Sequence, residues 1–314
     1  MTRRPAPDND LWPDTASLDG MALLLDAPAF VRRPAGVVRV TGEDRLSFLH
    51  TLLSQHLEDM PAGRAADFLY LDAKAAPVAA GRALVRDADV LLVTPPDVAP
   101  ALAERLDGMR FLLRVEVADE SADWAMASLR GGAPAGPAEP MTFQEAGGGI
   151  VVRDRSGGVD LLGRAAWLDA RLAGEALPEA SAEHWEAWRI ARGEPAWGRE
   201  IAPGHRPQEL GLLPTHVHLR KGCYPGQESI AKTWNLGRPR RALAVVELDA
   251  EPEAGVLRVG DKEAKVTSAA PRDGGWLAMA LLPVDPEGRP PETVDVPPGR
   301  VLRKVGDGLP IPGA

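Results

Sequence analysis

Residues 220–230 read RKGCYPGQESI, and this stretch decides which fold the chain is assigned. It holds the single cysteine of the chain, Cys223, two positions after Lys221 and between Gly222 and Gly226. Glycine permits positive φ and close backbone approach, which a tight ligand-facing loop requires. Neighbouring cations favour a thiolate, and a helix that begins near Gly226 would add its N-terminal dipole. The stretch predicts a reactive thiol; the alternative is a small buried cysteine, as most free cysteines are.

The charge of this region is opposite to that of the whole chain. The 314 residues carry a formal net charge of −9, yet residues 220–241 hold six cations and one acid, Glu228. The cations are Arg220, Lys221, Lys232, Arg238, Arg240 and Arg241. Such an inversion suits an anionic ligand such as a phosphate, a polycarboxylate tail or an RNA backbone, and the alternative is a solvated surface loop. With a pI near 5.3, direct nucleic-acid binding is the least favoured of these readings.

Composition limits the cellular setting. One cysteine excludes a disulfide framework and a CxxC-type metal cage within a single chain. The N-terminus lacks the apolar run of a signal peptide, and apolar stretches such as Met21–Leu25 are far shorter than the ~20 residues of a membrane span. We therefore expect a cytoplasmic protein with no membrane partner.

Apolar periodicity along the chain predicts a mixture of helices and strands. A helix is expected after Thr41-Gly42, with leucines at 46, 49, 53 and 57, and another between Ser181 as its N-cap and Gly193 as its stop signal. Strands are predicted at 37–40, 68–71, 83–86, 90–94, 113–117, 150–153 and 159–162, with a helix at 95–106.

The same pattern suggests three parts. Residues 1–17 have the composition of a disordered arm, and residues 18–235 form a body with a long loop or possible break near 131–149. Residues 236–314 contain six short β-type runs, at 242–248, 256–259, 264–267, 276–282, 293–296 and 301–305. Such regular spacing is typical of a small β-barrel.

Lys221-Gly222-Cys223-Tyr224-x-Gly226-Gln227-Glu228 resembles the signature of the YgfZ-type proteins, folate-binding relatives of the aminomethyltransferase (T-protein) of the glycine cleavage system. Residues 40–49, 188–195 and 236–241 resemble further elements of that family, so the resemblance covers roughly 37–305. It implies an α+β fold: an aminomethyltransferase-like multi-part α/β body of two intertwined subdomains around a central channel, with a C-terminal antiparallel β-barrel.

The resemblance also implies a function. It implies a folate-binding accessory protein for the assembly or maintenance of iron–sulfur clusters in client enzymes, among them radical enzymes that modify tRNA. Tetrahydrofolate or a derivative is the implied cofactor, and Cys223 the implied essential thiol. The residues expected to bind the cofactor are Lys221, Tyr224, Gly226, Gln227, Glu228, Arg241 and Trp188. For Gln227 and Glu228 the alternative is a helix N-terminus, and for Trp188 it is the core.

Departures from the transferase branch leave catalysis open. That branch carries an acidic pair at the positions of Ala79-Ala80 and a folate-contacting glutamate at the position of Ala191. Alanine accepts no proton or hydrogen bond from an amine, which argues against aminomethyl transfer. The alternative function is a folate-dependent one-carbon transferase with an unknown acceptor.

Other polar residues give weaker signals. His216 and His218 alternate in the strand-like sequence THVHLR and would share a face, but no third ligand stands at a suitable spacing, so we expect no metal site. Asp67 and Asp72 bracket a short strand and are interpreted as turn residues.

Overall fold

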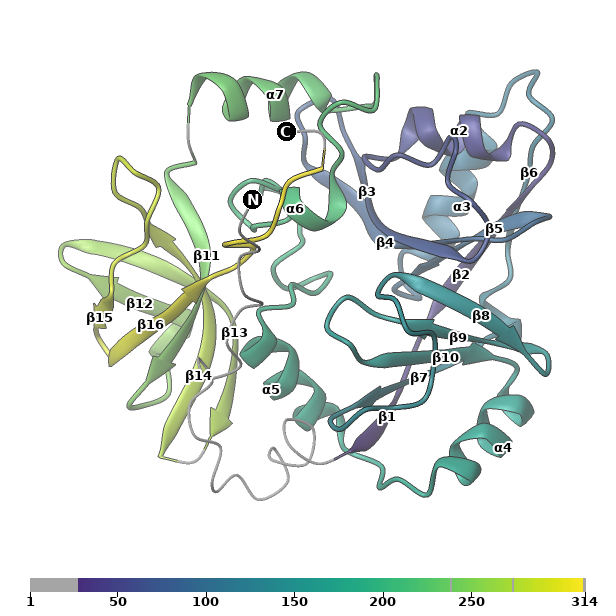
Figure 1. Ribbon diagram of the computed structural model, residues 1–314. Coiled ribbons are helices and arrows are strands. Elements are labelled where there is room, and N and C mark those ends of the chain that lie inside the picture. The colour runs from purple at the N-terminus through teal and green to yellow at the C-terminus, as the bar shows by residue number, and fades with distance from the viewer. Residues whose placement is uncertain (1–27, 238, 273, 313–314) are drawn as a thin grey trace, which may run out of the picture.

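Figure 1 shows a computed structural model of the chain, in which the described residues are 28–237, 239–272 and 274–312. The predicted arm at residues 1–17 and Arg238 lie outside them. The described residues form two antiparallel sheets with few helices. The larger sheet has ten strands, in the order β1 (Ala29–Arg33), β7 (Ala125–Arg130), β10 (Val159–Gly163), β9 (Gly149–Arg153), β8 (Thr142–Ala146), β3 (Arg64–Leu71), β4 (Pro77–Val85), β5 (Asp89–Thr94), β2 (Gly36–Thr41) and β6 (Glu116–Asp119).

The ten-stranded sheet consists of two five-stranded halves that meet at one point. β3 and β8 share a single register pair, Arg64 with Thr142. Helices α2 (Arg45–Leu52) and α3 (Ala99–Asp107) cover the outer face of the half that contains β2 to β6. Helix α4 (Ala165–Glu175) covers the other half. Strand β1 belongs to the half that contains β7 to β10, and the chain then enters the other half at β2. The two halves are therefore intertwined in sequence.

The sheet is folded so that the inner faces of its halves face each other. Arg82 on β4 contacts Asp160 on β10, with Nη1 3.1 Å from Oδ2. These strands are four positions apart in the sheet, about 19 Å in a flat sheet at the usual strand spacing. An arginine side chain cannot span that distance, so the halves must approach each other across the fold.

The second sheet is the predicted barrel. Its six strands run in the order β12 (Val256–Val259), β13 (Lys262–Arg272), β14 (Gly275–Pro283), β11 (Arg241–Leu248), β16 (Pro298–Lys304) and β15 (Thr293–Asp295). An antiparallel bridge between Arg258 and Val296 joins the two outer strands, so the sheet is nearly closed. The six β-type runs predicted from sequence all fall within these strands or at their ends, and the predicted fold class is confirmed.

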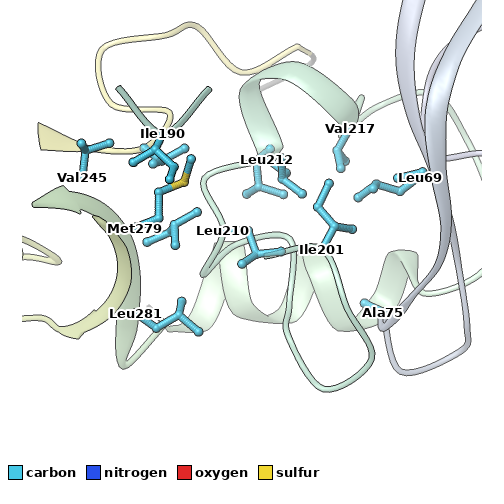
Figure 2. Packing of buried hydrophobic residues seen from close by; sticks show 14 of the residues in the cluster. Leu69, Ala75, Ile190, Ile201, Leu210, Leu212, Val217, Val245, Met279 and Leu281 are labelled. Atoms are coloured by element: carbon cyan, nitrogen blue, oxygen red, sulfur yellow. The ribbon is translucent and has the colours of Figure 1, made fainter. Parts of the chain in front are cut away.

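An apolar cluster joins the barrel to the body. Helix α5 (Ala182–Arg192), the short α6 (Leu213–His216) and α7 (Gln227–Leu236) lie between the sheets (Figure 1). Figure 2 shows Leu69 of β3, Ile190 of α5 and Met279 of β14 in this cluster, which we call the central apolar cluster. Beside it, the buried pair Arg189–Glu200, 2.9 Å apart, reaches Ser268 of β13.

Several local expectations differ from the structure. The segment 131–149 contains β8, which pairs with β9, so it is part of the sheet and not simply a long loop. The sequence THVHLR begins in the last two residues of α6 and continues as a loop, not a strand, so His216 and His218 do not share a strand face. Asp72 caps a turn by accepting the N–H groups of Lys74 and Ala76 at 2.8 Å, as predicted. Asp67, in contrast, lies inside β3 and is buried. Its carboxylate can be buried there because it forms an ion pair with Arg82.

Candidate functional site

The loop that precedes α7 holds Cys223 at the surface. Its thiol is free and exposed, and α7 begins four residues later at Gln227. Gly226 has φ +82°, and a Cβ there would lie 2.6 Å from the carbonyl oxygen of Asp72. Only glycine therefore lets this loop rest on the β3–β4 turn. The buried-cysteine alternative is excluded.

A reciprocal contact between Lys221 and His50 anchors the same loop. The Lys221 Nζ donates a hydrogen bond to the carbonyl oxygen of His50 in the last turn of α2. The His50 Nε2 lies 2.6 Å from the carbonyl oxygen of Lys221. Lys221 Nζ also lies 4.8 Å from the ring centroid of Tyr224, a cation–π contact. These contacts hold the loop against the body, while Cys223 stays exposed.

His50 is a neutral tautomer in this arrangement. Its Nδ1 accepts the backbone N–H groups of Leu57 and Glu58 at 3.3 and 3.2 Å, so the proton resides on Nε2 and is donated to Lys221. Burial lowers the pKa of His50, which agrees with the neutral form. Burial also lowers the pKa of Lys221 to about 8, with Cys223 acting in the opposite direction. Lys221 and Cys223 are therefore electrostatically linked.

The other residues expected to bind a cofactor are not gathered at one place. Gln227 and Glu228 form the first turn of α7, and Arg241 at the start of β11 pairs with Glu209 at 3.2 Å. Tyr224 is buried in the central apolar cluster, where burial raises its pKa to about 12. Trp188 is 2% exposed and stacks on Trp185 at 5.2 Å. Their roles in cofactor binding stay predictions.

A layer of four charged side chains and one serine lies between the two halves of the large sheet. It consists of Asp67, Arg82, Ser128, Arg130 and Asp160, which we call the polar layer. Arg82 binds Asp67 and Asp160, and Arg130 binds Asp160 at 3.0 Å. Each of these residues lies on the inner face of its strand, because the neighbouring residues of the strand pack outward against helices.

Apolar packing encloses the polar layer on both sides. On β3, Asp67 stands between Ala65, which packs with the β8–β9 core, and Leu69 of the central apolar cluster. On β4, Leu84 and Ala80 flank Arg82 in the same way. Burial opposes ionisation of Asp160, but Arg130 and Arg82 outweigh it and hold its pKa well below its usual range.

Two charged groups beside the polar layer, Glu194 and Arg33, form no close ion pair with any described side chain. No described side chain lies within ion-pair distance of the carboxylate of Glu194, and burial raises its pKa to about 7. Among the described residues Arg33 has no carboxylate partner either; it donates to Ser128 Oγ at 3.1 Å and lies 4.0 Å over the ring of Trp185. Burial lowers the pKa of Arg33 to about 10. Both side chains keep partial solvent access, so a ligand could reach them.

Sequence reasoning missed most of this layer. A charged residue inside an otherwise apolar strand, as at Asp67 in RAADFLYL, is the signal that could have found it. His50 gave no such signal, because its role depends on a partner 171 residues away. Ala79, Ala80 and Ala191, the positions where the resemblance predicts the acids of the transferase branch, are all buried in apolar clusters.

No metal cage accompanies these groups. Within the described ranges, no set of three or more His, Cys, Asp or Glu side chains is placed to hold a metal ion. Burial lowers the pKa of His216 to about 4, and its Nδ1 is occupied by Thr215 Oγ1 at 2.7 Å. None of the described helices combines the length and apolar character needed to cross a bilayer.

The fold is that of the glycine cleavage aminomethyltransferase. The solved structure of that enzyme from Bartonella henselae matches with a TM-score of 0.74 and 16% identity, covering 85% of this chain and 81% of the enzyme. At this identity the match shows the fold alone. No protein-family model matches the chain.

Three curated proteins are similar to the chain in sequence. It is 28% identical over 260 residues to a chloroplastic protein of Arabidopsis thaliana with a provisional transferase name, covering 74% of this chain and 59% of the relative. It is 26% identical to the mitochondrial iron–sulfur cluster assembly factor IBA57 homolog of Cryptococcus neoformans, covering 68% of this chain and 64% of the relative. It is 32% identical over 111 residues to the tRNA-modifying protein YgfZ of Aliivibrio fischeri, covering 32% of this chain and 35% of the relative.

The chain thus spans less than two thirds of the length of each of these relatives. Together with the fold they confirm the resemblance that the signature predicted: the chain is a YgfZ-type relative of the aminomethyltransferase T-protein.

Proposed function

We propose that this protein is a folate-binding accessory protein that assembles or maintains iron–sulfur clusters in selected client enzymes. Through clients that are radical tRNA-modifying enzymes, it supports tRNA modification indirectly. The observation that carries the proposal is the exposed Cys223 in a loop anchored by Lys221, His50 and Gly226. The names of two relatives, an iron–sulfur cluster assembly factor and a tRNA-modifying protein, support it.

Tetrahydrofolate or a derivative is the proposed cofactor, bound beside the polar layer. The fit is one of donors and acceptors: a pterin ring presents N–H donors that suit the carboxylate of Glu194 and acceptors that suit the guanidinium of Arg33. Trp185, half-buried, offers an aromatic surface nearby. The buried Nε of Arg130 has no hydrogen-bond partner among the described residues, so it is available as a donor to a ligand.

The proposed role of Cys223 is that of a working thiol and not of a transferase residue. The acids of the transferase branch are replaced by buried alanines, so no carboxylate stands at those positions to activate an amine. A single cysteine supplies at most one ligand to a cluster, so cluster coordination would need a client or a small thiol in addition. Direct contact with RNA is not proposed, because the chain carries a net charge of −9 and two of the six cations of the basic stretch are engaged: Lys221 is buried and Arg241 pairs with Glu209.

Complementation of a bacterial strain that lacks its own YgfZ-type protein tests the proposal. The readout is the content of thiomethylated tRNA nucleosides, measured by mass spectrometry. The wild type should restore this content, Cys223→Ala should not, and the control Lys232→Ala, exposed on α7, should restore it. All three proteins should have the same melting temperature, because neither changed side chain is in the core. Restoration by Cys223→Ala would refute the proposal.

One observation favours the alternative, a folate-dependent one-carbon transferase. A carboxyl whose pKa is near 7, as at Glu194, suits general acid–base chemistry at neutral pH. A transferase would convert methylenetetrahydrofolate in the presence of an amine acceptor, and Glu194→Gln would abolish that conversion. Purified protein that leaves the folate unchanged over a range of acceptors would exclude this alternative.

A further inference from the structure

Glu194 is held beside the polar layer by its backbone and not by its carboxylate. Helix α5 ends before Gly193, which has φ +64°, and Glu194 is the next residue. The N–H of Glu194 donates to the carbonyl oxygen of Arg189 at 2.8 Å, and its own carbonyl oxygen accepts from Arg189 Nη1 at 3.3 Å. No described side chain forms a hydrogen bond or an ion pair with the carboxylate. The backbone therefore fixes the residue, while the carboxylate stays available to a ligand.

The charged groups around this carboxylate come from both sheets and from α5 itself. They are Arg33 of β1, Arg82 of β4, Arg130 of β7, Asp154 after β9, Asp160 of β10, Arg303 of β16 and Arg192 of α5. The two aspartates already have a counter-ion, because Arg130 Nη2 lies 2.7 Å from Asp154 and 3.0 Å from Asp160. Glu194 is a third carboxylate near Arg130, without an ion pair of its own. Burial therefore raises the pKa of Glu194 to about 7, although Arg130 acts in the opposite direction.

Two buried N–H groups in the same region have no hydrogen-bond partner among the described residues. They are Nε of Arg130 and Nε1 of Trp188, in residues that are 3% and 2% exposed. The Arg130 guanidinium lies 4.9 Å from the ring centroid of Trp188, so the two donors are neighbours. Buried donors in native proteins are nearly always paired. With the carboxylate of Glu194, these donors suit a ligand that presents both hydrogen-bond donors and acceptors.

We propose that folate binding beside the polar layer is coupled to the loss of a proton from Glu194, so that the ionised carboxylate holds the ligand. This inference rests on the proposed function, because it takes folate as the ligand. An N–H donor of a pterin ring stabilises a carboxylate more than a carboxylic acid, because hydrogen bonds to the charged form favour that form. The proton passes to the solvent, which the partly exposed side chain of Glu194 reaches. No covalent bond to the ligand forms or breaks.

The other end of a folate would have the opposite effect on Glu194. The glutamate tail carries carboxylates, and a carboxylate beside Glu194 would disfavour a second negative charge there, so binding would take up a proton. The half-buried ring of Trp185, 4.0 Å from the guanidinium of Arg33, offers an aromatic surface that suits the pterin ring and not the tail. The sign of the proton exchange therefore reports which end of the ligand occupies the site.

Calorimetric titration of the full chain with tetrahydrofolate, under anaerobic conditions, tests this inference. At pH 7 the heats of binding in two buffers of different ionisation enthalpy give the number of protons exchanged. We expect the release of about half a proton per folate, because Glu194 is about half ionised in the free protein at a pH near its pKa. The affinity should also rise about tenfold from pH 6 to pH 8, as the ionised fraction of the free protein grows.

Glu194→Gln removes the titrating group but keeps an oxygen acceptor. Its affinity should be weaker than that of the wild type at pH 8, constant between pH 6 and pH 8, and free of proton release. The control Glu104→Gln, exposed on α3, should behave as the wild type does. Binding that is independent of pH, that takes up a proton, or that keeps its pH dependence in Glu194→Gln would overturn the inference and leave the proposed cofactor standing. Absence of any binding would refute both.

Discussion

At the scale of single residues, Gly226 determines whether the thiol loop can rest on the body. A Cβ at this position would lie 2.6 Å from the carbonyl oxygen of Asp72 and 2.9 Å from Cα of Ala75. Gly204 also has positive φ, but a Cβ there would meet nothing within 4 Å. Gly204→Ala should therefore lower the free energy of unfolding by about 1 kcal/mol, from the strained φ alone. Gly226→Ala should lower it by a further ~1–3 kcal/mol, from the clash. Urea denaturation measures both, and equal losses would contradict the close approach.

Glu194 is the residue whose charge state should be visible in a pH series. Folding raises its pKa from 4.5 to about 7, so between these values the folded chain binds more protons than the unfolded chain. The free energy of unfolding therefore falls as pH rises through this window, and the loss remains above pH 7. Glu194→Gln carries no charge, so it should be more stable than the wild type by about 1–2 kcal/mol at pH 8. At pH 4.5 the two should be nearly equal, and a difference independent of pH would contradict this assignment.

At the scale of elements, the clamp between α2 and the thiol loop depends on His50. His50→Leu keeps an apolar side chain but removes three hydrogen bonds, to Leu57, Glu58 and Lys221. The backbone amides of residues 219–226 should then exchange with deuterium at least about tenfold faster, while β4 and β5 exchange as before. His56→Leu, a change in the neighbouring ring 4.7 Å away, is the matched control. If both variants exchange alike, the clamp is not what orders the loop.

Elements whose signals are local could be predicted from sequence. Helix α5 begins after Ser181, which forms a capping box with His184, and ends before Gly193, as its sequence indicates. The barrel strands were found because turn residues separate them. The polar layer could not be predicted, because Asp67, Arg82 and Asp160 meet only when the sheet folds over. For the same reason the position of His50 against Lys221 required the structure.

At the scale of the whole molecule, a buried charged network joins the body to the barrel. Arg189 and Glu200 are 2% and 0% exposed, and both contact the hydroxyl of Ser268 on β13 at 2.6 Å. Glu200→Gln would leave the guanidinium with the partly exposed Glu186 as its counter-ion, so the loss should be smaller than the about 3–5 kcal/mol of a fully uncompensated buried charge. Thermal unfolding should show a matching fall in melting temperature. Arg189→Met in the same chain should recover part of it, and no recovery would mean that the network is not coupled as the distances indicate.

The two proposed sites, the polar layer and the Cys223 loop, lie on different elements of the molecule. The polar layer lies between the halves of the sheet, and the Cys223 loop is held at the surface by α2 and the β3–β4 turn. Ala79, Ala80 and Ala191 stand where the resemblance predicts the acids of the transferase branch. We therefore propose that folate is bound and not turned over, and that the thiol acts on client proteins.

Titration of the purified full chain with tetrahydrofolate, followed by tryptophan fluorescence, tests this central claim most directly. We expect a saturable change in fluorescence, because Trp185 lies beside Arg33 at the polar layer, and recovery of the folate unchanged after incubation. Absence of any saturable change, or consumption of the folate by turnover, would contradict the claim.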